Sequence, residues 1–324
     1  MSRLSRILIV AVACVAPLFG PPAIADEYPS RPIRLIMPIG AGGSADALGR
    51  PFAEKLKVLL KQPIVIENRP GAQMSIGASY VAKSPPDGYT LLFMPGGQVL
   101  APRLVSNLSY DPINDFTPIT VVGRFGYVLA SNPAQPFKTL PELIAYAHDH
   151  PGIVTIAVSD PVTRVGAELL RKDLALNLVI VPFKGGGEVA TALLGNHVAT
   201  ALLFPGVFDP FQKDRRMTAL AVTTASRLSA LPDVPTVAES AKLPDYDLGS
   251  WFLLAGPAHL PNAVVDKLHH DAAQVLSDPA MINIIRSEFF EPVADATPQA
   301  ARRTMHDYAF KMGKLFDETG VGPQ

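Results

Sequence analysis

Short apolar runs and amphipathic segments alternate along this chain, and turns rich in glycine and proline separate them. Period-two alternation or continuous apolar character predicts strands, and apolar residues three or four apart predict helices. The predicted strands span residues 33–37, 63–67, 89–94, 154–158, 178–181, 198–204 and 217–223. The predicted helices begin at residue 45 or span 52–60, 76–82, 161–173, 188–194, 263–276 and 298–319. This order predicts an α/β fold with mostly parallel sheets flanked by helices.

Two apolar segments, 126–131 and 249–256, look like connections between two halves of the molecule. The strand and helix pattern occurs before the first segment and repeats between the two, so the inner part of the chain looks inserted into the outer part. We expect domain 1 to comprise residues 26–126 plus 251–324 and domain 2 to comprise residues 127–250. Two domains joined at such crossings create a cleft, and clefts of this kind commonly bind small ligands.

The N-terminus carries the pattern of an export signal. Arg3 and Arg6 precede an apolar run over residues 7–20, and an Ala-x-Ala cleavage site ends at Ala25. This pattern predicts a secretory signal peptide at residues 1–25 and a periplasmic location for the mature chain. The run is shorter than the roughly 20 apolar residues that span a bilayer. A membrane anchor, or a lipoprotein cleavage site at Cys14, remains the alternative.

Composition removes several classes of function. The single cysteine, Cys14, lies in the predicted signal peptide, so the mature chain would have no disulfide, no thiolate nucleophile and no cysteine metal ligand. The formal net charge is −1 and no block of like charge is present, which excludes a nucleic-acid partner. Hydrophobic residues make up 48% of the chain, which indicates a compact protein with a large core.

The turn after the first predicted strand is the first candidate site. Gly40, Gly42 and Gly43 let a ligand approach the backbone closely, and we expect Ser44 to cap a helix that begins at Ala45. The first N–H groups of a helix lack partners and lie at its positive end, so the turn is suited to binding an anion. A simple strand-to-helix connection explains the same residues.

Longer motifs carry a resemblance to a known family. They are YPSRPIRLIMP from Tyr28, ENRPGAQMSIGASYVAKSPPDGYTLLF from Glu67, VPFKGGG from Val181, LPDVPTVAES from Leu231 and SWFLLAGPAHLP from Ser250. The chain resembles the Bug family, the TctC-like periplasmic receptors of tripartite tricarboxylate transporters, from Tyr28 to near the C-terminus. The resemblance implies a type II Venus flytrap that closes over a di- or tricarboxylate or an aromatic acid. It implies a monomer with no enzymatic activity, cofactor or metal, which delivers its ligand to a membrane permease or a sensor domain.

The resemblance also implies ligand contacts in the first half of the chain. They are Ile39, Gly40, Ala41, Gly42, Gly43 and Asp46 in the first loop, and Gly97 and Gln98 after the third strand. Ile39 and Gly40 replace the aromatic residue and second proline usual in the family. Asp46 could bind the ligand or only hold the loop, because an acidic residue in a first helical turn is favoured anyway.

In the second half the implied contacts are Ser159, Asp160, Arg164, Lys184, Gly185, Leu203 and Phe204. The N–H groups after Ser159 form a second possible anion site. Arg164 stands near the family's histidine and would suit a bidentate bond to a carboxylate, although Arg164 and Lys184 could equally be surface residues. The acidic residue that the family often carries just after its GGxV motif is absent, since residues 196–199 read NHVA.

An exported dehydrogenase is the alternative function. Gly40, Gly42 and Ala45, followed by Glu67, mimic a dinucleotide-binding fingerprint, but export counts against a nicotinamide cofactor. The chain has no GxSxG or HExxH motif, which argues against a hydrolase. Residues 148–150 read HDH and are interpreted as a helix end before Pro151 rather than a metal site.

Overall fold

The computed structural model describes residues 28–320, so the predicted signal peptide and Cys14 lie outside the described residues. The strands are β1 (Ile33–Met37), β2 (Ile64–Asn68), β3 (Thr90–Pro95), β4 (Phe116–Gly126), β5 (Val128–Ser131), β6 (Thr155–Val158), β7 (Val179–Pro182), β8 (Thr200–Leu203), β9 (Thr218–Val222) and β10 (Gly249–Pro257). The helices of the first half are α1 (Ser44–Leu60), α2 (Ser75–Ala82), the 3-10 helix η1 (Gly96–Leu100) and α3 (Ala101–Leu104). Those of the second half and the C-terminal part are α4 (Leu140–Asp149), α5 (Pro161–Asp173), α6 (Gly186–Leu194), α7 (Pro205–Lys213), α8 (Val237–Ala241), α9 (Asn262–Ser277), α10 (Pro279–Ser287) and α11 (Pro298–Thr319).

The strands form two five-stranded sheets, in the orders β2-β1-β3-β10-β4 and β7-β6-β8-β5-β9. Within each sheet four strands run the same way and one strand, β10 or β5, runs opposite to its neighbours. The predicted α/β architecture with mostly parallel sheets is therefore confirmed. The exact domain boundaries stay a prediction.

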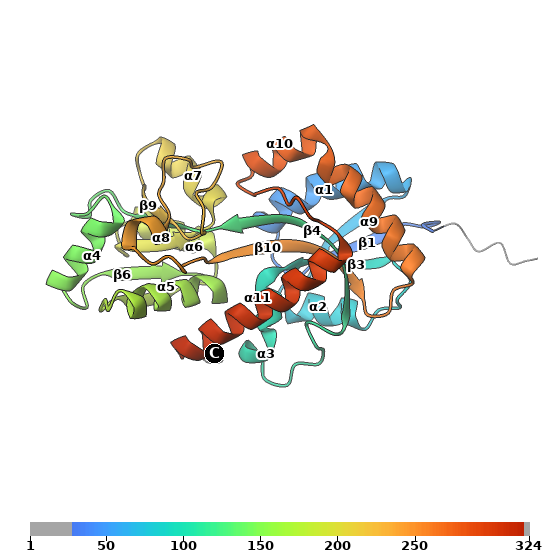
Figure 1. Ribbon diagram of the computed structural model, residues 1–324, viewed down its shortest axis with the longest axis horizontal. Coiled ribbons are helices and arrows are strands. Elements are labelled where there is room, and N and C mark those ends of the chain that lie inside the picture. Colours follow the sequence, from blue (N-terminus) through green and yellow to red (C-terminus); the bar gives the residue numbers. More distant parts are fainter. Residues whose placement is uncertain (1–27, 321–324) are drawn as a thin grey trace, which may run out of the picture.

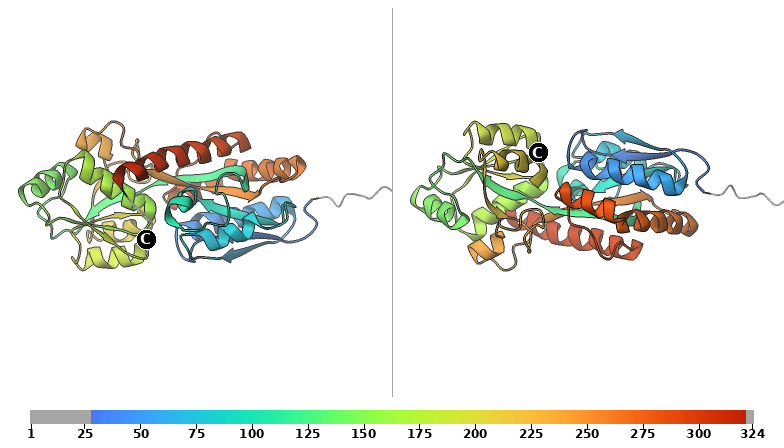
Figure 2. Two further views of the ribbon diagram at one scale, coloured as in Figure 1. Left: turned by 90° about the horizontal axis from the view of Figure 1, so that it is seen from below. Right: turned by 90° about the horizontal axis from the view of Figure 1, so that it is seen from above.

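Two long strands connect the halves. β4 ends at Gly126 and β5 begins at Val128, so the predicted crossing at 126–131 is a strand end, one residue and a new strand. The second crossing is the start of β10, which pairs with β4 along its whole length. Figures 1 and 2 show β4 and β10 side by side across the middle of the molecule.

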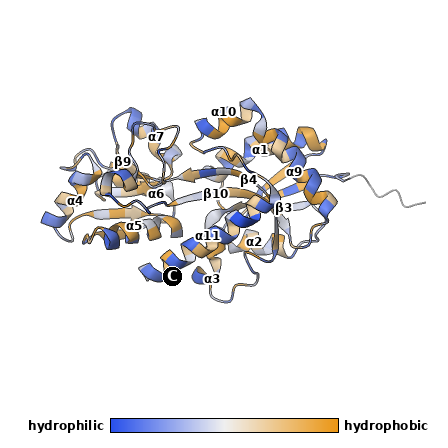
Figure 3. Ribbon diagram, in the orientation of Figure 1, coloured by the Kyte–Doolittle hydropathy of each residue, from blue (hydrophilic) through white to orange (hydrophobic). Residues whose placement is uncertain are grey.

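Helices cover both sheets. α1, α9 and α10 pack together beside the first sheet, and α11 packs against β4, η1 and α5, so it touches both halves (Figure 1). Hydrophobic and hydrophilic residues share α9 and α11 (Figure 3), as expected for helices with one packed face. Among residues 28–320 no helix is long and apolar enough to cross a bilayer.

Aromatic side chains join the halves at the crossing strands. Phe125 and Phe252 stack with ring centroids 5.6 Å apart, and Phe125 meets Phe204 edge-on at 5.4 Å. Phe290 packs against all three rings. This contact lies where β4 and β10 leave the first sheet, so it stabilises the region about which the halves would move.

The first helix differs from its prediction. Ser44 does not cap it, because Gly43 is the N-cap in extended conformation and Ser44 is the first helical residue. The helix predicted separately at 52–60 belongs to the same element, which continues through Pro51. Other predictions agree closely, notably α11, which spans the predicted residues 298–319 and starts at a Thr297 cap followed by Pro298.

Candidate functional site

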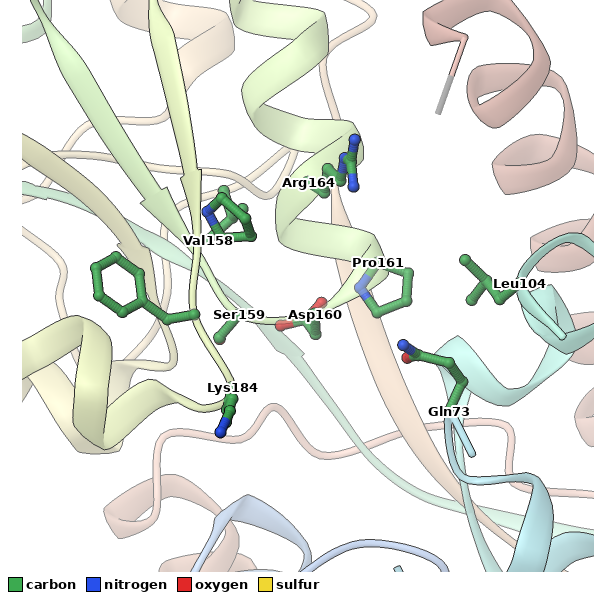
Figure 4. Close-up of a pocket in the computed structure, with 10 residues that line it drawn as sticks. Gln73, Leu104, Val158, Ser159, Asp160, Pro161, Arg164 and Lys184 are labelled. Atoms are coloured by element: carbon green, nitrogen blue, oxygen red, sulfur yellow. The ribbon is translucent and has the colours of Figure 1, made fainter. Parts of the chain in front are cut away.

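Loops from the two sheets meet at one cavity. In each sheet, parallel strands place the loops that follow them at the same edge, as ligand sites of open α/β sheets require. The cavity has a volume of about 340 Å³. Its lining residues, most of them labelled in Figure 4, are Gln73, Leu104, Val158, Ser159, Asp160, Pro161, Arg164, Pro182, Phe183 and Lys184. Gln73 and Leu104 come from the first half and the rest from the second, so the cavity lies between the halves.

Four of the predicted contacts line this cavity: Ser159, Asp160, Arg164 and Lys184. Gln73 and Leu104 were not among the predicted contacts. Gln73 stands inside the motif that begins at Glu67, where the glycine at position 71 indicates an unusual backbone but says nothing about the direction of a side chain. Leu104 ends α3, a one-turn helix whose apolar residues read as ordinary core.

The first loop exposes the open start of α1. Residues 40–43 are exposed, and Gly42 has φ +84° with no atom within 4 Å of the position a Cβ would take. Asp46 accepts the N–H of Gly42 and pairs with Arg50 at 2.8 Å. Asp46 thus holds the loop, while no hydrogen bond in the described structure uses the N–H of Ser44 or Ala45. Those two N–H groups therefore have no hydrogen-bond partner among the described residues, and Ala45 is fully buried.

The start of α5 is closed, meaning that the backbone N–H groups there already have hydrogen-bond partners. The N–H groups of Val162 and Thr163 donate to Asp160 Oδ1 at 2.9 and 3.0 Å. The N–H groups of Ser159 and Asp160 donate to the Thr163 hydroxyl, both at 3.1 Å. This capping box satisfies the N–H groups that an anion would need, so the predicted backbone anion site after Ser159 is wrong.

Side chains supply the positive charge of this wall. Arg164 and Lys184 belong to none of the ion pairs among residues 28–320, and in Figure 4 they lie at opposite ends of the lining. Asp160 adds a carboxyl between them, and burial raises its pKa, although its bonds to Val162 and Thr163 oppose that shift. With Asp160 ionised, the three side chains leave the wall with one net positive charge.

The remaining predicted contacts lie elsewhere in this conformation. Gln98 is fully buried and donates to the Tyr110 hydroxyl, and Leu203 belongs to the core of the second sheet. Phe204 packs in the aromatic contact at the crossing strands. Gly97 lies close to Val162 of α5, since a Cβ there would meet the Val162 side chain at 3.8 Å. The ligand-binding roles of these residues, and of Ile39, Ala41, Asp46 and Gly185 in the exposed or capping turns, stay predictions.

The residues behind the alternative functions have other partners. Glu67, the acid of the dinucleotide fingerprint, accepts hydrogen bonds from Arg34 at 2.7 Å and from Arg69 at 3.0 Å. Its carboxylate is therefore occupied rather than available to a ribose. α4 ends at Asp149 with His150 as its C-cap, as the helix-end interpretation predicts. No metal-binding cluster of three His, Cys, Asp or Glu residues occurs between residues 28 and 320.

Comparison with known proteins gives a consistent family. Residues 48–321 match the tripartite tricarboxylate transporter family receptor. The chain is 32% identical to protein BugT of Bordetella pertussis over 328 aligned residues, covering 99% of this chain and 98% of BugT.

Solved structures that resemble this chain support the same family. R. palustris Rpa4515 with adipate is 30% identical, has a TM-score of 0.84, and is matched over 92% of this chain and 100% of its own. MatC from Rhodopseudomonas palustris with bound malate is 26% identical, with a TM-score of 0.78 and coverage of 89% and 99%. The matched family is a receptor family, and a further solved relative, 29% identical with a TM-score of 0.80, is the periplasmic binding protein BugD, so the expectation of a binding protein rather than an enzyme is confirmed. The chain belongs to the receptor family of the tripartite tricarboxylate transporters, a family of periplasmic solute-binding proteins.

Proposed function

We propose that this chain captures a small organic carboxylate between its two halves in the periplasm and delivers it to a tripartite tricarboxylate-type permease. The observation that carries the proposal is the cavity of about 340 Å³, whose second-half wall presents Arg164 and Lys184 without ion-pair partners. An anionic ligand would neutralise charges that the protein leaves uncompensated. The ligands of two structural relatives, adipate and malate, are both dicarboxylates.

Two kinds of anion-binding group would hold the ligand. The free N–H groups at the start of α1 would bind one carboxylate, and the cationic side chains beside α5 would bind the other end. The two halves, residues 26–126 plus 251–324 and residues 127–250, would close by rotation about the two crossings. Residues 1–25 would direct export and be removed.

Thermal shift and calorimetry across dicarboxylates, tricarboxylates, aromatic acids, amino acids, neutral amides and sugars test the ligand class. Arg164→Gln should weaken binding of the best acid about tenfold or more, because a bond to a charged group is lost. Arg286→Gln is the matched control, since Arg286 is exposed on α10, away from the cavity lining. A response to amides or sugars with none to acids would contradict the proposal.

Delivery is tested separately. Uptake of the identified acid by cells that express a cognate permease should depend on this protein and fall with Arg164→Gln in proportion to affinity. Binding without any receptor-dependent uptake would leave the carboxylate site standing and overturn the permease assignment.

A further inference from the structure

The loop between β2 and α2 has an unusual backbone. Gly71, Ala72, Gln73 and Met74 have consecutive φ values of +120°, +44°, +51° and +71°. Only glycine adopts such angles without cost, so three residues with side chains are held in an unfavourable region. Residues held at such angles cost stability, persist only where the surrounding structure fixes them, and cluster at functional sites.

Gln73 is the residue of this loop that reaches the cavity. Its side chain is exposed, and in Figure 4 its amide points toward Asp160 and Pro161 across the cavity. No hydrogen bond within residues 28–320 uses that amide. Gln98, by contrast, is buried with its amide committed to Tyr110. Of these two glutamines, only Gln73 presents a free donor and acceptor to a bound ligand.

The position of Gln73 defines which part of a ligand it can meet. It approaches from the first half, opposite the wall that carries Arg164. In the binding mode proposed above, the acid has one carboxylate at the start of α1, and its other end would lie between these two side chains. The neutral Nε2 donor of Gln73 would add a hydrogen bond to a second carboxylate there, and would have no partner on an alkyl end.

We propose that Gln73 is a specificity-determining residue, which donates a hydrogen bond to the second carboxylate of a bound dicarboxylic acid. This inference rests on the proposed carboxylate-binding function and names the second carboxylate as the group of the acid that Gln73 recognises. The left-handed loop is retained because it aims this amide into the cavity, at the expense of stability.

The test compares acids that match in length and differ at one end. Adipate and hexanoate, and shorter and longer pairs of the same design, are titrated by calorimetry into the wild-type protein and Gln73→Gly. The glycine relieves the left-handed backbone, so the melting temperature should rise by a few degrees. Affinity for the preferred diacid should nevertheless fall about tenfold, while affinity for the matched monoacid should stay within about twofold.

Two further variants separate side chain from backbone. Ala72→Gly relieves the same kind of strain at an exposed residue outside the cavity lining, and it should raise stability without changing the diacid preference. Gln73→Glu keeps the length of the side chain but places a like charge beside the second carboxylate, so it should weaken diacid binding more than Gln73→Gly does.

Three results would overturn the assignment. An equal loss of affinity for diacid and monoacid in Gln73→Gly would mean that Gln73 bridges the two halves rather than recognising the second carboxylate. Unchanged affinity for both would mean that it touches neither. Absence of binding by every acid in the wild-type protein would remove the proposed function and this inference together, whereas the first two results leave the carboxylate receptor intact.

Discussion

Two helices differ in how the backbone N–H groups of their first turns are bonded: α5, which begins in the cavity lining, and α1, which begins in the exposed first loop. α1 starts from Gly43, which has no side chain to cap it, and the N–H groups of Ser44 and Ala45 remain free. α5 starts from Asp160, whose carboxylate and partner Thr163 satisfy the backbone N–H groups of the first turn. Both starts follow a strand at the same kind of sheet edge, yet only α1 can offer its backbone to an anion.

Under the proposed function, the two halves would bind different parts of the ligand. Backbone dipoles at α1 are fixed in direction and suit a carboxylate that every ligand shares. The side chains of Arg164 and Lys184 on the other wall vary readily with sequence, so they suit the part of the ligand that differs between receptors. Because the capping box occupies the N–H groups at the start of α5, that backbone would not bind the ligand.

The largest effect is expected from Gly42→Val at the open start. Gly42 has φ +84°, which a β-branched residue strongly avoids. The loop must therefore rearrange, and its N–H groups would no longer point toward a bound anion. Calorimetry should show carboxylate binding weakened beyond about 30-fold, with the circular dichroism spectrum unchanged because the loop is exposed and a Cβ at this position meets no atom within 4 Å.

Gly320→Val provides the control for backbone strain. Gly320 has φ +66° and equally open surroundings, but it caps the far end of α11. It should destabilise the protein to a similar extent and leave affinity unchanged. If both variants lost affinity equally, general destabilisation rather than the α1 start would be responsible.

Thr163→Val should produce the next effect, on stability. The hydroxyl accepts from Ser159 and Asp160, and its loss leaves both N–H groups unpaired in a half-buried turn. The free energy of unfolding in urea should fall by about 1–2 kcal/mol. Thr163→Ser keeps the hydroxyl and should cost less. Equal losses from both variants would assign the effect to packing rather than to the capping box.

A smaller and opposite effect is expected from Asp160→Asn. Asparagine caps helices as well as aspartate does, so the capping bonds remain while a negative charge leaves the cavity wall. Affinity for a dicarboxylate at pH 7 should rise by a few fold. A decrease would mean that Asp160 binds a donor group of the ligand.

The same carboxyl should make binding dependent on pH. Burial raises the pKa of Asp160, and an anionic ligand beside it would raise that pKa further. Binding then takes up protons, so affinity should increase as pH falls, over the range in which the added diacid remains ionised. Asp160→Asn should flatten this profile, and a persistent slope in the variant would assign the proton uptake to another group.

Much of the fold follows from local pattern. α11 could be placed to the residue because a Thr-Pro start and a long amphipathic repeat agree with its packing against β4. The start of α1 could not be placed to the residue. Ser44 is a residue type that favours capping, but whether Ser44 or Gly43 is the N-cap depends on backbone angles. Helices α7 and α10 each begin with a proline, and the sequence pattern alone did not separate them from loops.

The site was less predictable than the fold. Arg164 and Lys184, which line the cavity, were identified through the family resemblance: Arg164 stands near the family's histidine, and Lys184 belongs to the VPFKGGG motif. Gln73 was not predicted to line the cavity, and the burial of Gln98 was not foreseen, because the direction of each amide is set by structure. η1 turns Gln98 inward to Tyr110, while the left-handed loop turns Gln73 outward.

The central claim is that the carboxylate binds at the open helix start and not at the closed one. Backbone amide chemical shifts of ¹⁵N-labelled protein, recorded while adipate or the best acid of the panel is added to saturation, test it directly. We predict large shifts for Ser44 and Ala45 and small ones for Val162 and Thr163, whose N–H groups stay bonded to Asp160. Large shifts at Val162 and Thr163 with none at Ser44 and Ala45 would contradict the account.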